Sequence, residues 1–580
     1  MADNNAKLAD LFQEMADVTE ILGGNRFRVN AFQKAARIIG ELTQDVSELG
    51  DVNELQKIDG IGEGTAHRIR EFLETGRIEE HEKLVKQVPN GVIALLQIPG
   101  LGPKSVATLW QQGGVTDTAT LKKKLDSGEL EDLPRMGRKT LENIKKNLAF
   151  AESAGQRVRI GEAMPLAQWF VDQLRAMKHV KEAHYAGSLR RGKETIGDID
   201  LLVAADPDKH GKTISNAFVK LDVVSEVLLK GATKTSIRTD KGIQADLRII
   251  EPAGYGAALL YFTGSKEHNI RLRERAINKG WKLSEYGLFN EKTDKRIAGK
   301  TEQEVYEKLG LAWIPPELRE DRDEIKLAEK GRIPDLIALN DIQSELHAHT
   351  TASDGIWSIR ELASAALDRG FHTVAVTDHS KSQVQANGLD AKRLEKHIEA
   401  VRAVADEMKG KITVLAGSEV DILADGKLDY PDSLLRELDI VVASPHSALS
   451  QDASKATKRL LKAIENRYVT ILGHPTGRLI NRREGLHPDI HEIVDAAAER
   501  GIALEINANN WRLDLRDTHA RVAVEKGVKL SINTDAHGPA DLDQLVYGIL
   551  TARRAGATKQ DVVNTFGKAQ LTKWLKSTRA

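Results

Sequence analysis

Two neighbouring segments decide the fold of the first half of the chain: Tyr185-Ala-Gly-Ser-Leu-Arg-Arg-Gly192 and Gly197-Asp-Ile-Asp-Leu-Leu-Val203. In the second segment Asp198 and Asp200 alternate with apolar residues, so on a β-strand both carboxylates face the same way. Adjacent carboxylates repel one another unless a cation lies between them. Asp246, the polar residue of a later strand-like run, supplies a third carboxylate. The pattern predicts a site for two Mg²⁺ ions, of which one activates an attacking hydroxyl and the other carries a triphosphate.

The residues just ahead of these carboxylates suit a phosphate group. Gly187 and Ser188 leave room for a phosphate, and Arg191 can offer it charge-assisted hydrogen bonds. A bare Asp-x-Asp is usually a solvated turn. The Gly-Ser pair at this spacing, together with a later strand aspartate, makes the combination specific for phosphate chemistry.

Helical patterns and repeated glycine turns precede this site. Residues 5–90 carry apolar residues at helical spacing. Three similar segments lie between apolar helical stretches, at residues 58–62, 98–102 and 133–137. Glycines in a tight turn free N–H groups at the start of the next helix, and these can hold a phosphate without reading a base. A single copy could be an ordinary turn, but three copies favour helix-hairpin-helix contact with DNA.

Length and composition limit the remaining possibilities. A chain of 580 residues is too long for one hydrophobic core, and its net charge of −1 means that any basic surface is local. The absence of cysteine excludes disulfides, cysteine-type zinc sites and thiol catalysis. No apolar run approaches the length of a membrane span, and the first residues lack the apolar region of a signal peptide. We therefore expect a soluble cytoplasmic protein.

The second half alternates short apolar runs with longer stretches of helical composition. Because parallel strands need helical crossovers, seven such alternations predict a parallel (β/α) barrel. A charged segment, residues 317–326, followed by Gly331-Arg-Ile-Pro334, predicts a linker ahead of it. The seven apolar runs are residues 342–346, 373–377, 412–416, 440–443, 469–472, 502–506 and 528–532.

Polar residues follow these runs, and residues 341–580 hold 11 of the 17 histidines. Barrel enzymes place their chemistry at the C-terminal ends of the strands, so these groups should converge on one mouth. Nitrogen and oxygen ligands without sulfur suit Mn²⁺, Zn²⁺ or Fe²⁺ better than Mg²⁺. Their number exceeds the needs of one ion and predicts two or three metals, which can clamp a phosphate diester and generate hydroxide from water. The groups are His347, His349 and Asp354; Asp378 and His379; Glu419 and Asp421; His446; His474; Asn507 and Asn509; Asp535 and His537.

Residues 1–320 resemble a family X DNA polymerase and are similar in organisation to DNA polymerase beta. The motifs GSLRRG, GDIDLLV and YFTGSKEHN carry the resemblance. It implies that Asp198, Asp200 and Asp246 are catalytic metal ligands, and that Gly187, Ser188 and Arg191 hold the incoming triphosphate.

The same resemblance assigns a nucleotide-selecting segment further along the chain. Tyr261, Phe262 and Gly264 would face the sugar, where a bulky group or a close backbone rejects a 2′-hydroxyl. Asn269 would reach the minor-groove edge of the new base, and Arg273 the template strand. Without the neighbouring motif, Tyr261 and Phe262 would be interpreted as ordinary core residues.

The N-terminal region departs from its relatives at one position. Relatives with 5′-deoxyribose phosphate lyase activity use a lysine amine as Schiff-base nucleophile after the first hairpin. Alignment on Gly60-Ile-Gly62 puts Arg68 there, and a guanidinium stays protonated and cannot form the imine. We predict phosphate binding through Lys34 and Arg68 without efficient lyase chemistry. The turn residues expected to contact DNA are Gly60, Gly62, Gly100 and Gly102.

Residues 340–575 resemble the PHP domain shared by bacterial DNA polymerases and histidinol phosphatase. Because no implied ligand is replaced by an inert residue, we expect an active domain. Arg478 is a candidate phosphate contact, and residues 507–511 are expected to line the same mouth. The other histidines (His372, His397, His487, His491 and His519) are expected to be surface or packing residues. The implied metal ligands are His347, His349, Asp354, His379, Glu419, His446, His474, Asp535 and His537.

The expected architecture is therefore multidomain. It combines helical and helix-hairpin-helix domains, an α+β nucleotidyltransferase palm with a thumb, and a distorted (β/α)7 PHP barrel. The expected boundaries are a lyase-like DNA-binding domain at 1–90, fingers at 91–155, palm at 156–255, thumb at 256–318, linker at 319–339 and PHP domain at 340–580.

The expected function is gap filling in bacterial base-excision repair, fused to metal-dependent 3′→5′ removal of nucleotides. The polymerase site would take two Mg²⁺ ions and the PHP site two or three Mn²⁺ or Zn²⁺ ions. Expected partners are gapped or primer–template DNA and deoxynucleoside triphosphates, with no membrane, for a monomer near the bacterial nucleoid. Cleavage at abasic sites or of 3′-phosphates is an alternative for the PHP domain. A template-independent nucleotidyltransferase and a non-enzymatic DNA-binding scaffold are rivals, disfavoured by Asn269 and Arg273 and by the intact carboxylate triad respectively.

Overall fold

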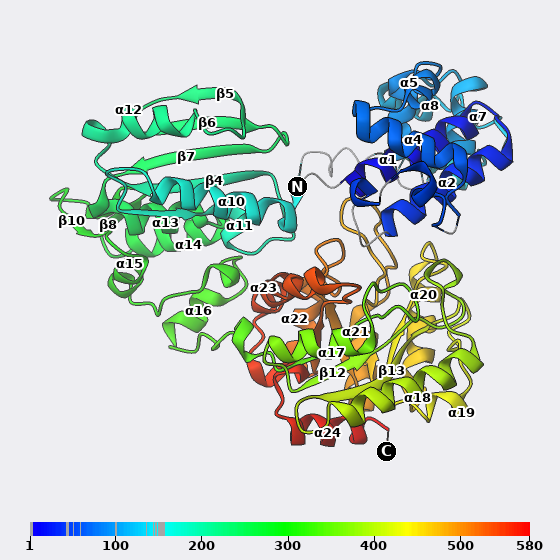
Figure 1. Ribbon diagram of the computed structural model, residues 1–580. Helices are drawn as coiled ribbons and strands as arrows, with labels where there is room; N and C mark the ends of the chain where they lie inside the picture. Colours follow the sequence, from blue (N-terminus) through cyan, green and yellow to red (C-terminus); the bar gives the residue numbers. More distant parts are fainter. Residues whose placement is uncertain are drawn as a thin grey trace. The chain divides into compact units, whose positions relative to one another are not determined.

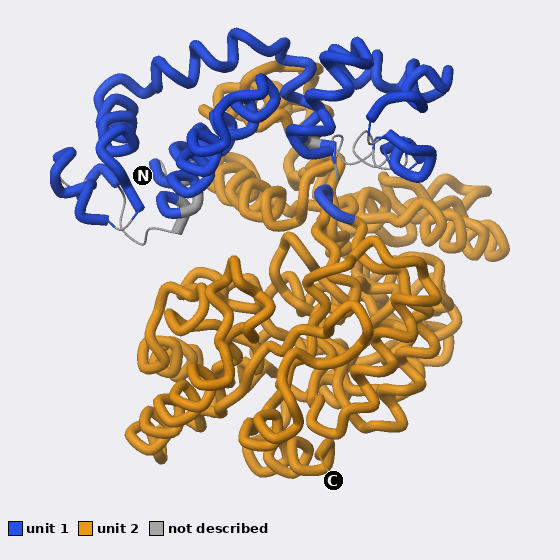
Figure 2. Tube along the Cα trace, turned by 90° about the vertical axis from the view of Figure 1, so that its right-hand side faces the viewer, with its two compact units in different colours: residues 1–155, 481–483 blue, residues 156–480, 484–580 orange. Residues whose placement is uncertain are grey.

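The computed structural model describes residues 4–579 except 42–45, 50, 59, 99–100, 135, 143, 146–147 and 149–156. The chain divides into two compact units, residues 1–155 with 481–483 and residues 156–480 with 484–580, which Figure 2 colours separately. In the described part of the chain, none of the helices combines the length and the apolar character that crossing a membrane requires.

Helices make up most of the first unit in its described residues. Buried apolar side chains such as Leu8, Phe12 and Phe32 recur at helical spacing and form a single core, as the sequence pattern predicts. Two of the predicted glycine turns lead directly into helices, because Gly62 is the N-cap residue of α4 and Gly102 that of α7. The helices are α1 (Asn4–Ile21), α2 (Arg26–Glu41), α3 (Val52–Leu55), α4 (Glu63–Thr75), α5 (Glu79–Val85), α6 (Asn90–Ala94), α7 (Pro103–Gln111) and α8 (Thr118–Ser127).

The second unit begins with an α+β region built on a five-stranded sheet of order β2-β4-β7-β6-β5 (Figure 1). Strands β4 and β7 are parallel, and the other pairs are antiparallel. Helix α10 (Ile160–Arg175) contributes Phe170 and Leu174 to the core beneath the sheet. The strands are β2 (Glu182–Tyr185), β4 (Asp198–Ala204), β5 (Val224–Lys230), β6 (Lys234–Thr239) and β7 (Gln244–Ile250), with the short pair β1 (Val158–Arg159) and β3 (Thr195–Ile196) and helices α11 (Gly187–Arg190) and α12 (Pro207–Phe218).

A smaller group of elements follows the sheet and shares a separate core around Leu272, Tyr306 and Leu309. A three-stranded antiparallel sheet of order β10-β9-β8 lies between its helices in the sequence. The elements are α13 (Tyr255–Thr263), α14 (Lys266–Ile277), β8 (Trp281–Ser284), β9 (Gly287–Asn290), β10 (Arg296–Ala298) and α15 (Glu302–Leu309).

The charged segment predicted to be a linker is packed rather than solvated. Arg319 is fully buried and forms two hydrogen bonds to Glu302, at 2.7 and 3.1 Å, while Arg190 bonds to the same carboxylate. A short helix, α16 (Glu324–Glu329), follows, and the buried Glu324 accepts a hydrogen bond from His268 at 2.7 Å. The charges of this segment therefore pair with partners in the preceding domain and in the PHP domain, which the charged sequence alone could not indicate.

The C-terminal region is the predicted parallel barrel. Seven strands pair in sequence order, all in parallel, and a further bridge between Ala348 and Ala536 links the two ends of the sheet. The apolar strand residues are almost fully buried, as a parallel sheet covered by helices requires. The strands are β11 (Ser344–Glu345), β12 (Thr373–Val376), β13 (Thr413–Asp421), β14 (Ile440–Ser444), β15 (Ile471–Leu472), β16 (Ala503–Asn507) and β17 (Leu530–Asn533).

Helices surround the strands of this barrel (Figure 1). Several begin at a side-chain cap, such as Ser358 ahead of α17 and Asp390 ahead of α18. The helices are α17 (Ile359–Asp368), α18 (Ala391–Glu407), α19 (Asp432–Leu435), α20 (Ala453–Ile464), α21 (Ile490–Arg500), α22 (Asp517–Glu525), α23 (Leu545–Ala555) and α24 (Lys568–Ser577).

Candidate active sites

The three predicted catalytic carboxylates meet on one face of the five-stranded sheet. The parallel register of β4 and β7 places Asp200 directly opposite Asp246, and Asp198 lies two residues earlier on the same face. Burial, with repulsion from the two other aspartates, raises the pKa of Asp200 to about 7. Lys234 lies 2.9 Å from Asp246 and neutralises part of the charge. Such crowding of carboxylates is what a divalent cation relieves.

The predicted triphosphate residues begin directly beside this cluster. A Cβ atom on Gly187 would lie 2.2 Å from Oδ2 of Asp200, and the φ of Gly187 is +60°. Glycine is therefore required both for space and for backbone conformation. Ser188 follows on α11, and Arg191 donates a 3.0 Å hydrogen bond from Nε to Glu320 and another to the carbonyl of Thr263.

The predicted sugar-facing residues lie near Arg191. A Cβ atom on Gly264 would lie 3.1 Å from Nη1 of Arg191. Tyr261 and Phe262 pack edge to face with ring centroids 5.1 Å apart, and Asn269 donates a 2.7 Å hydrogen bond to the carbonyl of Tyr261. Arg273 is half-buried on α14, the same helix that carries Asn269.

Some of the predicted DNA-binding residues of the N-terminal region face open space, and others already contact protein side chains. Gly62 and Gly102 face open space, so that a phosphate can approach the helix starts. Lys34 packs over the Gly60 turn, where a Cβ atom would lie 2.3 Å from Cε of the lysine. Arg68 is paired with Glu80, so a phosphate would have to compete with this carboxylate. Gly100 lies outside the described residues.

A cluster of buried histidines and carboxylates occupies the mouth of the barrel. Nε2 of His349 lies 3.0 Å from Oδ1 of Asp535 and 3.6 Å from Oε2 of Glu419, while Nε2 of His347 lies 3.4 Å from Oε1 of Glu419. These buried nitrogens and the two oxygens facing His349 make no hydrogen bond of acceptable geometry. Ligand atoms about 2.1 Å from a common ion lie roughly 3.0–3.4 Å apart, so the spacing fits a divalent cation.

Two further groups adjoin the first. His349, Asp354, His379 and His537 form one, and His379, Glu419 and His446 form the other. The groups share His349, His379 and Glu419, as ligands of neighbouring ions would. His474, the ninth predicted ligand, lies 2.8 Å from Glu419 through Nε2.

Titration within the cluster also suits metal binding. Burial and the neighbouring His379 lower the pKa of His349 to about 4, so its ring is neutral and a nitrogen lone pair is available. Burial alone would lower the pKa of His347, but the carboxylates of Glu505, Glu419 and Asp535 raise it well above its usual value. A cation bound here would replace that proton.

Known proteins resemble the chain over nearly its whole length. Family models match for a helix-hairpin-helix domain at residues 3–78, a SAM-like helix-hairpin-helix tandem at 92–149, the DNA polymerase beta thumb at 258–320 and the PHP domain at 345–509. The chain is 38% identical over 568 residues to the DNA polymerase/3′-5′ exonuclease PolX of Bacillus subtilis (strain 168), and the match covers 98% of both. The chain belongs to the family X DNA polymerases that carry a PHP domain.

More distant relatives match one part of the chain each. DNA polymerase lambda of Arabidopsis thaliana is 24% identical over 348 residues, which are 55% of this chain and 62% of that protein. A probable phosphatase of Thermoanaerobacter sp. (strain X514) is 31% identical over 233 residues, which are 38% of this chain and 89% of that protein.

Two side chains support the PHP histidines: Asp421, which was expected at the barrel mouth, and Glu505, which was not assigned from the sequence. Glu505 accepts a hydrogen bond from Nδ1 of His347 at 2.7 Å, and Asp421 bonds to Nδ1 of His446. Such contacts fix the ring orientation and tautomer of a ligand. The signal for Glu505 was an ionisable residue inside an apolar run that a parallel barrel buries on both faces.

Two of the nine predicted PHP ligands have unusual backbone conformations. His474 and Asp535 have φ values of +22° and +54°, in a region that non-glycine residues rarely adopt. The amide of His474 is held by a 2.8 Å hydrogen bond to Glu505, and the carboxylate of Asp535 by a 3.0 Å bond from Asn507. Strained residues of this kind collect at functional sites, where the surroundings hold them in place.

The structure places Arg478 against the palm. Its buried guanidinium forms two hydrogen bonds to Glu194, at 3.0 and 2.6 Å, so a phosphate would have to compete with this carboxylate. Residues of the segment 507–511 contact two different parts of the protein. Asn507 contacts the cluster of histidines and carboxylates through Asp535, whereas Asn510 accepts a 2.8 Å hydrogen bond from Arg159 of the palm.

Proposed function

We propose that the protein is a template-directed DNA polymerase that fills short gaps during DNA repair, and that its PHP domain removes nucleotides from 3′ ends of the same DNA. The meeting of Asp198, Asp200 and Asp246 beside Ser188 carries the first part of the proposal. The buried histidine and carboxylate cluster carries the second. The Bacillus subtilis relative, named for both activities, supports their combination in one chain.

In the polymerase reaction, the primer 3′-hydroxyl attacks the α-phosphate of a deoxynucleoside triphosphate and pyrophosphate leaves. Asp198, Asp200 and Asp246 would hold two Mg²⁺ ions, which supply activation of the hydroxyl and stabilisation of the leaving group. Ser188 and Arg191 would orient the triphosphate by hydrogen bonds to its oxygens.

In the PHP reaction, the nine clustered residues would hold two or three Mn²⁺ or Zn²⁺ ions, which generate hydroxide and neutralise the phosphate. Glu505 and Asp421 would keep the ligand rings in position by hydrogen bonds. The similarity to a probable phosphatase favours a second candidate, removal of 3′-phosphates, at the same cluster.

Two double variants test the assignment. Asp198→Ala/Asp200→Ala should abolish gap filling on a gapped duplex and leave Mn²⁺-dependent degradation of 3′ ends intact. His347→Ala/His349→Ala should do the reverse. Gap filling by the first variant, or degradation by the second, would refute the corresponding site.

The choice of DNA substrate separates the alternatives. A template-directed enzyme should extend a gapped duplex and leave a single strand unextended, whereas a template-independent transferase should extend both. For the PHP domain, strands ending in a 3′-hydroxyl, a 3′-phosphate or an abasic site distinguish exonuclease, phosphatase and endonuclease activity.

A further inference from the structure

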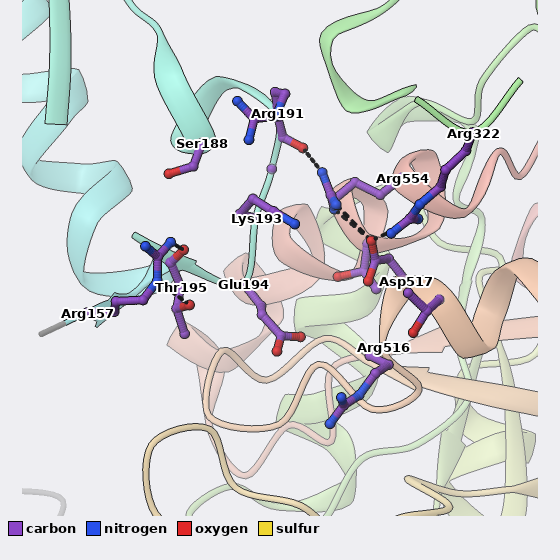
Figure 3. Close-up of a pocket in the computed structure, with 13 residues that line it drawn as sticks. Arg157, Ser188, Arg191, Lys193, Glu194, Thr195, Arg322, Arg516, Asp517 and Arg554 are labelled. Atoms are coloured by element: carbon purple, nitrogen blue, oxygen red, sulfur yellow. Dashed lines mark hydrogen bonds and ion pairs between the residues drawn. The ribbon is translucent and has the colours of Figure 1, made fainter. Parts of the chain in front are cut away.

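A cavity of about 530 Å³ lies in the second unit between the palm and the PHP domain. Figure 3 shows Ser188, Arg191 and Lys193 of the palm and Arg516, Asp517 and Arg554 of the PHP domain around it. The PHP residues lie at the start of α22 and on α23. Part of the cavity wall therefore comes from PHP residues that belong neither to the triphosphate motif nor to the cluster of histidines and carboxylates.

The cations of this cavity outnumber the carboxylates that they share. Glu320 contacts Arg191 at 3.0 Å, Arg554 at 2.8 Å and Lys193 at 3.8 Å. Asp517 contacts Arg554 at 2.7 Å and Arg322 at 3.4 Å. Another lining carboxylate, Glu194, is already paired with Arg478. Four cations on two carboxylates leave an excess of two positive charges.

Arg516 adds a further positive charge to the wall of the cavity. In the described part of the chain no carboxylate lies within 4.0 Å of its guanidinium, and its buried Nε has no hydrogen-bond partner. Burial, and then Arg516, lower the pKa of the nearby His519 to about 4. Burial, and then Arg554, likewise lower the pKa of Lys193. Burial is the larger cause of both shifts, and the neighbouring guanidinium adds to it.

We propose that Arg516 of the PHP domain extends the phosphate-binding site of Ser188 and Arg191, with pyrophosphate released by nucleotide incorporation as the expected occupant. The uncompensated charge suits a multiply charged anion, and the hydroxyls of Ser188, Thr195 and Thr518 can donate further hydrogen bonds to it. The cavity begins at Ser188, next to the glycine that touches Asp200. The identity of the occupant rests on the proposed polymerase activity, whereas binding of pyrophosphate does not.

The same chemistry could reach the cavity from two sources, the released product or the terminal phosphates of a bound nucleoside triphosphate. In either case Arg516 of the PHP domain contributes to a phosphate site next to the polymerase carboxylates. The PHP domain would thereby affect polymerase product inhibition without any contact to the DNA.

The test is calorimetric titration of the full chain with inorganic pyrophosphate in metal-free, chelator-containing buffer. Arg516→Gln should weaken binding at least fivefold, and Arg516→Lys, which keeps the charge, should restore it to within twofold. Arg360→Gln is the matched control, because Arg360 is exposed on α17 and pairs with Glu407 away from the cavity. Thermal melting of each variant checks that the fold is retained.

Steady-state gap filling by Arg516→Gln then identifies the source. An unchanged KM for the deoxynucleoside triphosphate with weaker pyrophosphate inhibition indicates the released product, whereas a KM raised by the same factor indicates the triphosphate. No binding to the unaltered protein, or equal affinity in a folded Arg516→Gln variant, would overturn the proposal. A protein that binds pyrophosphate but fills no gaps would instead refute the proposed function.

Discussion

At the scale of single residues, Asp200 links the predicted polymerase site to pH. Because its folded pKa of about 7 lies above the ordinary value of 3.8, its contribution to stability in the metal-free protein is lost as pH rises from about 4 to 7. A cation must displace the proton below pH 7 and meets an ionised carboxylate above it. The apparent dissociation constant for Mg²⁺ should therefore fall about tenfold per pH unit up to pH 7 and then level off. Titrations from pH 5.5 to 8.5 measure this, and Asp200→Asn should remove the dependence.

Glu505 carries a second prediction at this scale. Its two oxygens accept from His347, from the amide of His474 and from Asn533, which donates at 2.9 Å. In Glu505→Gln the side-chain NH₂ group would face one of these donors, and that hydrogen bond would be lost. We expect PHP metal affinity to fall about 10–100-fold while gap filling persists. Mn²⁺ titration of nuclease activity checks this, and an unchanged Mn²⁺ requirement would mean that Glu505 does not position His347.

Arg68 carries a third prediction at the scale of single residues. Its guanidinium is held by Glu80 and cannot act as the amine of a Schiff base. Borohydride treatment with DNA bearing a 5′-deoxyribose phosphate should trap no more adduct than in Arg68→Ala. An efficiently trapped adduct would show that another amine supplies lyase chemistry.

At the scale of elements, the hairpin turns can be tested without loss of helix stability. Gly102 begins α7 with φ −86° and open space around it, so Gly102→Asp supplies a better N-cap and should preserve the melting temperature. The new carboxylate would repel a DNA phosphate, and we expect roughly tenfold weaker binding to gapped DNA.

Gly567→Asp is the matched control, because Gly567 is the open N-cap glycine of α24 in the PHP domain. Fluorescence anisotropy with a labelled gapped duplex compares the two variants. Equal affinity of both would refute the role of the second hairpin in DNA binding.

Elements were predicted well where one periodicity dominates, and less well where polar residues are buried. All seven predicted apolar runs of the barrel overlap strands, because each run must be covered on both faces. The third strand, however, extends to Asp421, since residues 417–421 pair with β14. Glu419 thus lies on a strand inside the barrel, where its charge hid the continuation of the apolar run.

At the scale of the whole molecule, the Arg478–Glu194 pair joins the PHP domain to the palm. Removing Arg478 leaves a partly exposed carboxylate and an unpaired carbonyl, so Arg478→Ala should cost about 2 kcal/mol, less than for a fully buried pair. For a domain of this size that is a decrease of roughly 4–8 °C in Tm.

A double-mutant cycle isolates the interaction. In a Glu194→Gln background the same substitution should cost clearly less, because the charge partner is already absent. Arg402→Ala, which breaks a surface pair with Asp439, is the control and should change Tm little. Equal losses in both backgrounds would mean that Arg478 acts by packing alone.

The sequence by itself determined the classes of element, the barrel and the residue types of both candidate sites, because periodicity and ligand chemistry are local properties. It could not decide which charges pair across domains. Arg478 and Glu194 are 284 residues apart and became partners only on folding, and the supporting role of Glu505 also emerged only there. The cationic cavity has the same origin, since its charges come from separate domains and are uncompensated only where packing brings them together.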